Sequence, residues 1–183
     1  RQGKLTEAEE MIRLAAGMQE RLLGRETAAI AETLGNLGVV LAQQDRPAEA
    51  EAAIRDALAL QEKLLGREHV DVARSLKKLG AILQQNGKPT EAENCLRAAL
   101  ALNRKLLGNQ HPEVASSLQL LAVALVGQGH NNEAEASYRE AIAIRQQMPA
   151  AAARSSASLV AALEQQGSLA ELDRMLLRPL DFM

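Results

Sequence analysis

The sequence predicts an all-α fold in which antiparallel helix pairs stack into a solenoid. Three observations lead to this prediction: an internal repeat of 42 residues, two helix-forming apolar stripes in each repeat, and a composition that disfavours sheets. Ala, Leu, Glu, Gln and Arg, all good helix formers, dominate, whereas aromatic residues make up only 1% of the chain. Because one helix pair cannot bury its apolar stripe alone, successive pairs must stack.

The repeat divides the chain into five segments. Residues 24–65, 66–107 and 108–149 align without gaps, and the first two are identical at 21 of 42 positions. Residues 1–23 match the second helix of a truncated repeat. Residues 150–183 match a shortened terminal repeat followed by a C-terminal tail. A fixed period of this length is typical of repeat architectures, in which each repeat contacts its neighbours.

The first helix of each repeat is predicted from apolar residues three and four positions apart. In the first complete repeat these are Leu34, Leu37 and Leu41, which a period of 3.6 residues places on one helix face. Gly38 lies on the same face, and Gly80 is its equivalent one repeat later. We expect the missing side chain at these two positions to let the neighbouring helix approach closely.

The second helix of each repeat has clear start and stop signals. Pro47 and Pro89 are predicted to lie in its first turn, where a missing N–H has no cost. Gly66 and Gly108 are predicted to end it as C-terminal caps. Between these signals, small and branched apolar residues recur at helical spacing, as at Ala50, Ile54, Ala57 and Leu58.

The pattern Leu-x2-Leu-Gly-x2-Leu, followed by Gly and Ala-x3-Leu-x2-Ala, resembles the tetratricopeptide repeat (TPR), with Leu where its consensus often has aromatic residues. The longer period, with Leu-Leu-Gly-x2-His-Pro-Glu-Val-Ala at residues 106–115 and Glu-Ala-Glu at 133–135, resembles the repeats of kinesin light chains and their bacterial relatives. The resemblance covers nearly the whole chain. It implies a right-handed superhelical solenoid whose concave face is lined mainly by first helices, and a scaffold that binds other proteins.

The sequence offers little for catalysis, and we predict no enzyme, no metal and no cofactor. His69 and His111 occupy equivalent positions before successive first helices, so we interpret them as helix-start residues and not as metal ligands. Cys95 is the only cysteine, which excludes an internal disulfide and fits a reducing cytoplasm. It fills the slot of Ala53 and Ser137 in sister repeats, so we interpret it as a small buried core residue.

Charge and hydropathy limit the classes of partner that the sequence predicts. A formal net charge of −2 gives no bias toward nucleic acid, and the longest apolar run is far shorter than the ~20 residues of a membrane span. We therefore predict neither nucleic acid nor membrane as a partner. The carboxylates that recur by repeat, such as Glu49 and Glu51, are interpreted as helix-start charges that favour the helix dipole.

The resemblance implies that first-helix residues before and between the core leucines face the groove, and that the late second helix adds Gln61, Asn103 and Arg145. Arg74, Lys77 and Lys78 lie within about one helical turn and form a basic cluster. An acidic and apolar peptide or protein segment suits this surface; the alternative is an ordinary solvated face. The candidate partner-binding residues are Asn36, Arg74, Lys77, Lys78, Asn103, Ser116, Gln119, Val123, Arg145 and Arg154.

A second hypothesis is self-assembly, with the chain as an oligomerisation module of a larger multidomain regulator. Residues 1–23 lack a first helix to pack against, so Met11, Ile12, Ala15 and Leu22 are expected to be partly bare. The alternative to self-association is that the chain is an excised fragment of a longer array. The tail, residues 180–183, combines an acid with large apolar groups. We expect it either to cap the last repeat or to dock in a neighbouring groove.

Overall fold

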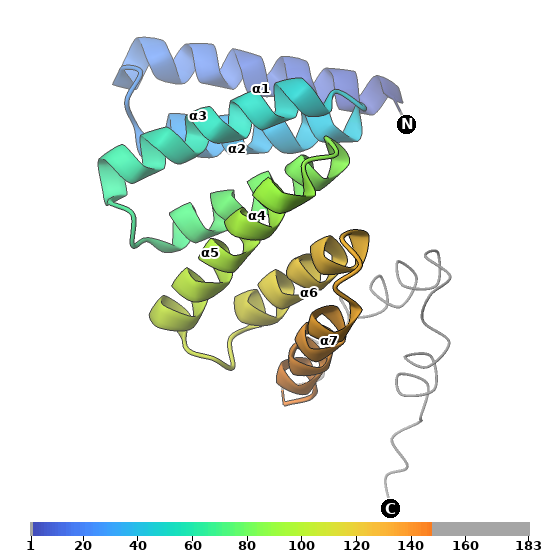
Figure 1. The fold of residues 1–183 in the computed structure, drawn as a ribbon. Helices are drawn as coiled ribbons and strands as arrows, with labels where there is room; N and C mark the ends of the chain where they lie inside the picture. The colour runs from blue at the N-terminus through green and yellow to red at the C-terminus, as the bar shows by residue number, and fades with distance from the viewer. Residues whose placement is uncertain (1, 148–183) are drawn as a thin grey trace, which may run out of the picture. The chain divides into compact units, whose positions relative to one another are not determined.

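The computed structural model describes residues 2–147, and these form seven α-helices with no strand among them (Figure 1). The all-α prediction is therefore confirmed. Most of the described residues belong to one compact unit that ends at Ile144. The terminal repeat predicted at 150–183, with Arg154 and the tail, lies outside the described residues. The helices are α1 (Gln2–Leu23), α2 (Ala28–Gln43), α3 (Pro47–Leu65), α4 (Val70–Gln85), α5 (Pro89–Leu107), α6 (Pro112–Gly127) and α7 (Asn131–Gln146).

Successive helices run antiparallel, and each repeat contributes a first and a second helix. The pairs are α2 with α3, α4 with α5, and α6 with α7, whereas α1 is a second helix at the start of the array (Figure 1). The first helices α2 and α4 contact one another, as do α4 and α6. The side chains between the core leucines of the first helices can therefore act together across repeats.

The two histidines begin first helices, as the sequence predicted. The Nδ1 atom of His69 accepts a hydrogen bond from the backbone N–H of Asp71 at 3.2 Å. His111 does the same for Glu113 at 3.1 Å. Thr27, at the equivalent place before α2, accepts from Ile30. These side chains satisfy N–H groups that a helix start leaves without a backbone partner.

The second helices begin and end at the predicted residues. Pro47 and Pro89 are the first residues of α3 and α5. Gly66 and Gly108 end these helices with φ angles of 78° and 84°, a left-handed region that favours glycine. The start and stop signals therefore fix the length of each second helix.

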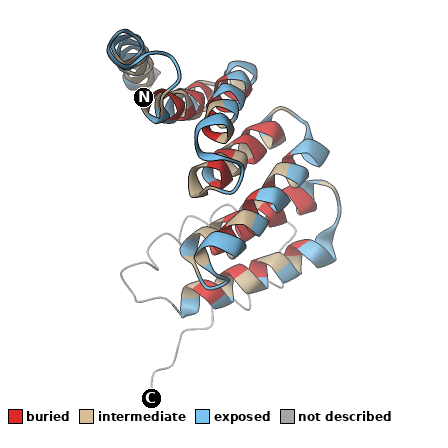
Figure 2. Ribbon diagram, turned by 90° about the vertical axis from the view of Figure 1, so that its left-hand side faces the viewer, coloured by how far each residue is buried: buried red, intermediate tan, exposed pale blue. Residues whose placement is uncertain are grey.

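The core lies between the facing sides of the helices, where buried residues gather (Figure 2). A Cβ built on Gly38 would lie 2.6 Å from the side chain of Ile54, and one on Gly80 would lie 2.6 Å from Leu96. The close approach predicted at the two glycines is confirmed. Cys95 is only partly buried and packs against the same core.

Ion pairs between successive second helices form a feature that the sequence interpretation missed. Glu51 is only 9% exposed and accepts hydrogen bonds from Arg55, Lys88 and Asn86. Arg55 also reaches Glu91 of the next repeat, at 2.9 Å. Arg97 repeats this arrangement with Glu93 and Glu133. Glu49 and Glu91 do lie in first turns, but Glu51 is a hub that joins two repeats.

Candidate protein-binding groove

A cleft of about 380 Å³ opens between α2, α4 and the end of α3. We call it the α2–α4 cleft. It lies at the first-helix face that was expected to bind a partner, and it has both apolar and charged walls. Its lining residues are Ala28, Ala29, Ala31, Glu32, Gly35, Asn36, Gln61, Leu65, Asp71, Arg74, Ser75 and Lys78.

Lys78 is a cation of this cleft that has no ion-pair partner among the described residues, although the more distant charge of Glu32 favours its charged form. Its Nζ lies 3.5 Å from Oδ1 of Asn36, and among the described residues no carboxylate lies within ion-pair distance of it. Burial, followed by the nearby charge of Arg74, lowers the pKa of the Lys78 ammonium. An anion placed beside Lys78 would offset this cost of burial.

The other two members of the predicted basic cluster already have partners within the chain. Arg74 is paired with Asp71 at 2.8 Å, although its side chain remains 56% exposed. Lys77 points toward α6, where its ammonium pairs with Glu113 and donates to Oγ of Ser116 at 3.2 Å. Lys77 and Ser116 therefore link α4 to α6, and only Arg74 and Lys78 border the α2–α4 cleft.

The remaining predicted site residues are more enclosed. Asn103 is 2% exposed and donates to Oγ of Ser117 at 3.0 Å, so it contributes to helix packing and not to the exposed surface. Gln119 is 8% exposed, and Val123 is half-buried on the same helix. Burial lowers the pKa of the Arg145 guanidinium.

Gln61, which the resemblance turns toward the groove, lines the cleft. It is 8% exposed, and within residues 2–147 its Oε1 has no hydrogen-bond partner. Its equivalent 42 residues later is Asn103, which is paired with Ser117. The two equivalent amides therefore have different hydrogen-bond partners, although both lie late in a second helix.

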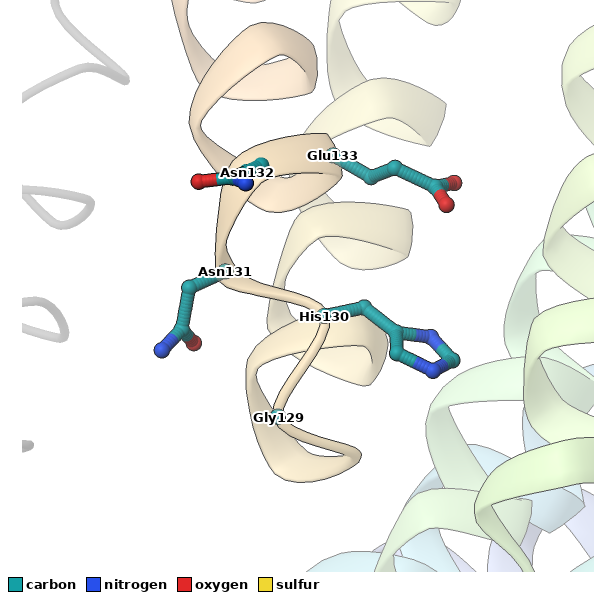
Figure 3. Close-up of a pocket in the computed structure, with 5 residues that line it drawn as sticks. All are labelled: Gly129, His130, Asn131, Asn132 and Glu133. Atoms are coloured by element: carbon teal, nitrogen blue, oxygen red, sulfur yellow. The ribbon is translucent and has the colours of Figure 1, made fainter.

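A second pocket, of about 390 Å³, lies at the turn before α7 and is lined by residues 129–133. Figure 3 shows His130 and Glu133 on one side of the turn and Asn131 and Asn132 on the other, so the polar groups do not converge. In the part of the chain that the structure describes, no group of His, Cys, Asp and Glu is arranged to hold a metal ion. Burial raises the pKa of the Cys95 thiol, which disfavours the reactive thiolate.

A family model described as tetratricopeptide repeat matches residues 1–63, 29–105 and 71–147. The chain belongs to the tetratricopeptide repeat family. Within residues 2–147, no helix of this TPR chain is both long and apolar enough to cross a membrane. No curated protein matches it.

Solved structures confirm the predicted solenoid fold. A putative kinesin light chain from Podosopora anserina, with nearly identical TPR-like repeats, is 24% identical, with a TM-score of 0.74 over 96% of this chain and 85% of that one. A variant of the same fungal protein gives 23% identity, a TM-score of 0.75, and 96% and 84% coverage. BtubC (BKLC) from P. vanneervenii is 23% identical, with a TM-score of 0.72 over 79% of this chain. The match spans only 57% of the length of BtubC.

Proposed function

We propose that this TPR chain is a scaffold that binds an acidic and apolar peptide or protein segment along the face formed by α2, α4 and α6. TPR repeats generally mediate protein–protein interactions, which supports the binding role. The single observation that carries the choice of ligand is Lys78, a half-buried cation that lines a cleft and has no carboxylate within ion-pair distance among the described residues.

The same face of α2, α4 and α6 also suggests that the ligand carries apolar side chains. Val39, Ala81 and Val123 are half-buried first-helix residues at equivalent positions in three successive repeats. They offer partial apolar surface that a ligand side chain would cover. The proposed function is binding without catalysis, and it requires no cofactor.

Lys78→Glu is expected to weaken the binding of acidic peptides by about tenfold or more, because a charge-assisted contact becomes a repulsion. The probes are short fluorescein-labelled peptides that combine Asp or Glu with Leu, Val and Phe, and the readout is fluorescence anisotropy. Peptides with Asn and Gln in place of the acids should bind the wild type less tightly.

Arg139→Glu is the matched control, since it makes the same charge change on α7, where Arg139 pairs with Glu135 of its own helix. It should leave the affinity within about twofold, because exposed pairs far from the ligand contribute little. The proposal is wrong if no acidic probe binds the wild type, or if Lys78→Glu and Arg139→Glu bind the probes equally well.

Self-assembly is a second candidate function, favoured by the outer face of α1. Met11, Leu14, Met18 and Leu22 are 63–79% exposed, and their spacing places them on one helix face. Ile12 is half-buried, and its covered part packs against the core. In Figure 2, α1, which carries the N label, shows no buried residue.

If this face pairs copies of the chain, the mass from light scattering should rise with protein concentration, and Met18→Glu should keep the chain monomeric because a buried carboxylate is costly. Glu10→Gln, an exposed change on the same helix, is the control and should not alter the mass. A wild type that stays monomeric at high concentration would rule out this function.

A further inference from the structure

Two successive first-helix junctions of this chain differ at one decisive position. Gly35 on α2 and Lys77 on α4 are equivalent, since they lie 42 residues apart in aligned repeats. At the α4–α6 junction, the Lys77 side chain is 14% exposed and reaches Glu113 and Ser116. At the α2–α4 junction, Gly35 has no side chain, and the cleft of about 380 Å³ lies there. The cleft therefore lies at the position that corresponds to the Lys77 side chain in the next repeat.

The wall of the cleft contains an unsatisfied acceptor. Gln61 is more than nine-tenths buried and lines the cleft, yet within residues 2–147 its Oε1 accepts no hydrogen bond. At the next junction the equivalent Asn103 donates to Ser117, which donates onward to the carbonyl of Glu113 at 2.9 Å. A buried acceptor without a partner costs free energy. A ligand that brings a donor to Gln61 would recover that cost.

Lys78, which also lines the cleft, offers a positive charge that an anion of the ligand would pair with. Its Nζ lies 3.5 Å from Oδ1 of Asn36 and 3.5 Å from the point where a Cβ on Gly35 would lie. Arg74 already pairs with Asp71, whereas Lys78 has no carboxylate within ion-pair distance among the described residues and is the cation that an external anion would pair with. Glu32 and Asp71 also line the cleft and repel an anion from their side, so the anion must approach along Lys78.

We propose that the α2–α4 cleft is a subsite for one Asp or Glu residue of a bound peptide. The side-chain carboxylate pairs with Lys78, and a backbone N–H of the same peptide segment donates to Oε1 of Gln61. A volume of about 380 Å³ lies within the range of small-ligand pockets, which suits one acidic residue and its flanking backbone. This inference rests on the proposed function, because it assumes a peptide ligand on the first-helix face.

The test fills the cleft without adding charge. Gly35→Met should lower the affinity for the acidic fluorescein-labelled peptides by about tenfold, because the new side chain occupies the place of the acid. A Cβ at Gly35 meets only Lys78, at an ordinary contact distance, so the fold should be kept. The unfolding midpoint should be equal or higher, since a helical glycine is replaced. Gly17→Met on α1 is the matched control, because nothing lies within 4 Å of its Cβ, and it should leave the affinity unchanged.

A second variant tests the hydrogen bond to Gln61. Gln61→Met removes the unpaired acceptor at similar side-chain length and should weaken the same peptides several-fold without loss of helicity. If Gly35→Met binds the acidic peptides as tightly as the wild type does, the cleft proposal is wrong while the proposed function stands. If Gln61→Met binds these peptides as tightly as the wild type does, the hydrogen bond assigned to Gln61 is wrong. A wild type that binds no acidic probe would instead remove the proposed function, and this inference with it.

Discussion

Gly80→Val should lower the free energy of unfolding by about 3 kcal/mol, the largest effect expected of any single substitution discussed for this protein. A Cβ on Gly80 would lie 2.6 Å from Cγ of Leu96 and 3.2 Å from the carbonyl oxygen of Ala92. Leu96 is fully buried and the contact with Ala92 is made by its backbone, so neither group can move aside without a large cost in free energy. The two helices of the repeat must therefore separate, and the apolar contacts between them are lost.

Urea unfolding followed by far-UV circular dichroism measures this effect. The control is Gly17→Val, the same chemical change in the interior of α1, where nothing lies within 4 Å of the added Cβ. Because valine is a better helix former than glycine, the control should be neutral or slightly stabilising. Equal losses in both variants would show that close helix approach at Gly80 is not the cause.

Glu51→Ala should destabilise the chain by about 2 kcal/mol, because charge-assisted hydrogen bonds of a nearly buried carboxylate are removed together. Lys88 donates to Glu51 at 2.9 and 3.0 Å, and Asn86 donates at 2.6 Å. Both donors come from the turn before α5, so the loss falls on the contact between two repeats. Lys88 is partly exposed and regains water, which limits the cost.

Glu135→Ala is the matched control for Glu51→Ala. Glu135 occupies the same position two repeats later, and among the described residues its one ion pair is with Arg139 on its own helix. An exposed pair of this kind contributes less than about 1 kcal/mol. Urea midpoints should therefore fall much further for Glu51→Ala than for Glu135→Ala, and similar midpoints would refute the role of Glu51 as a hub.

Acid should reproduce part of the effect of Glu51→Ala. The hydrogen bond from Lys88 is the largest cause that lowers the pKa of Glu51 below its ordinary value of 4.5. A carboxyl with a lowered folded-state pKa contributes stability above its unfolded pKa, and that stability is lost as pH falls through the folded pKa. The wild-type midpoint should hold from pH 7 to about 5 and then decline, and Glu51→Ala should decline less steeply. Parallel declines would contradict the assignment.

The fold was predictable because its signals are local. Pro47, Gly66 and His69 act within one helical turn, and their roles follow from backbone chemistry alone. The roles of Gly38 and Gly80 followed once the two helices of a repeat were expected to pack against each other. The structure confirms the predicted role of each of these residues.

The site was less predictable because it depends on contacts far apart in the chain. Lys77 and Lys78 are adjacent, yet one bonds Glu113 on α6 and the other borders the α2–α4 cleft. No local pattern separates them, since the choice depends on a carboxylate 36 residues away. Gln61 and Asn103 are equivalent and differ by one methylene, yet Oε1 of Gln61 has no hydrogen-bond partner among the described residues, whereas Asn103 donates to Ser117.

The ion pairs between second helices make the stiffness of the array a function of ionic strength. Arg55 with Glu91 and Arg97 with Glu133 join consecutive repeats through side chains that are 47–62% exposed, where dissolved ions reach them. The apolar core, which consecutive repeats share, carries no charge and is not screened. Added salt therefore weakens only the ionic part of the contact between repeats, and the shared apolar core keeps consecutive repeats together, so the bending flexibility of the array increases modestly as the electrolyte becomes more concentrated.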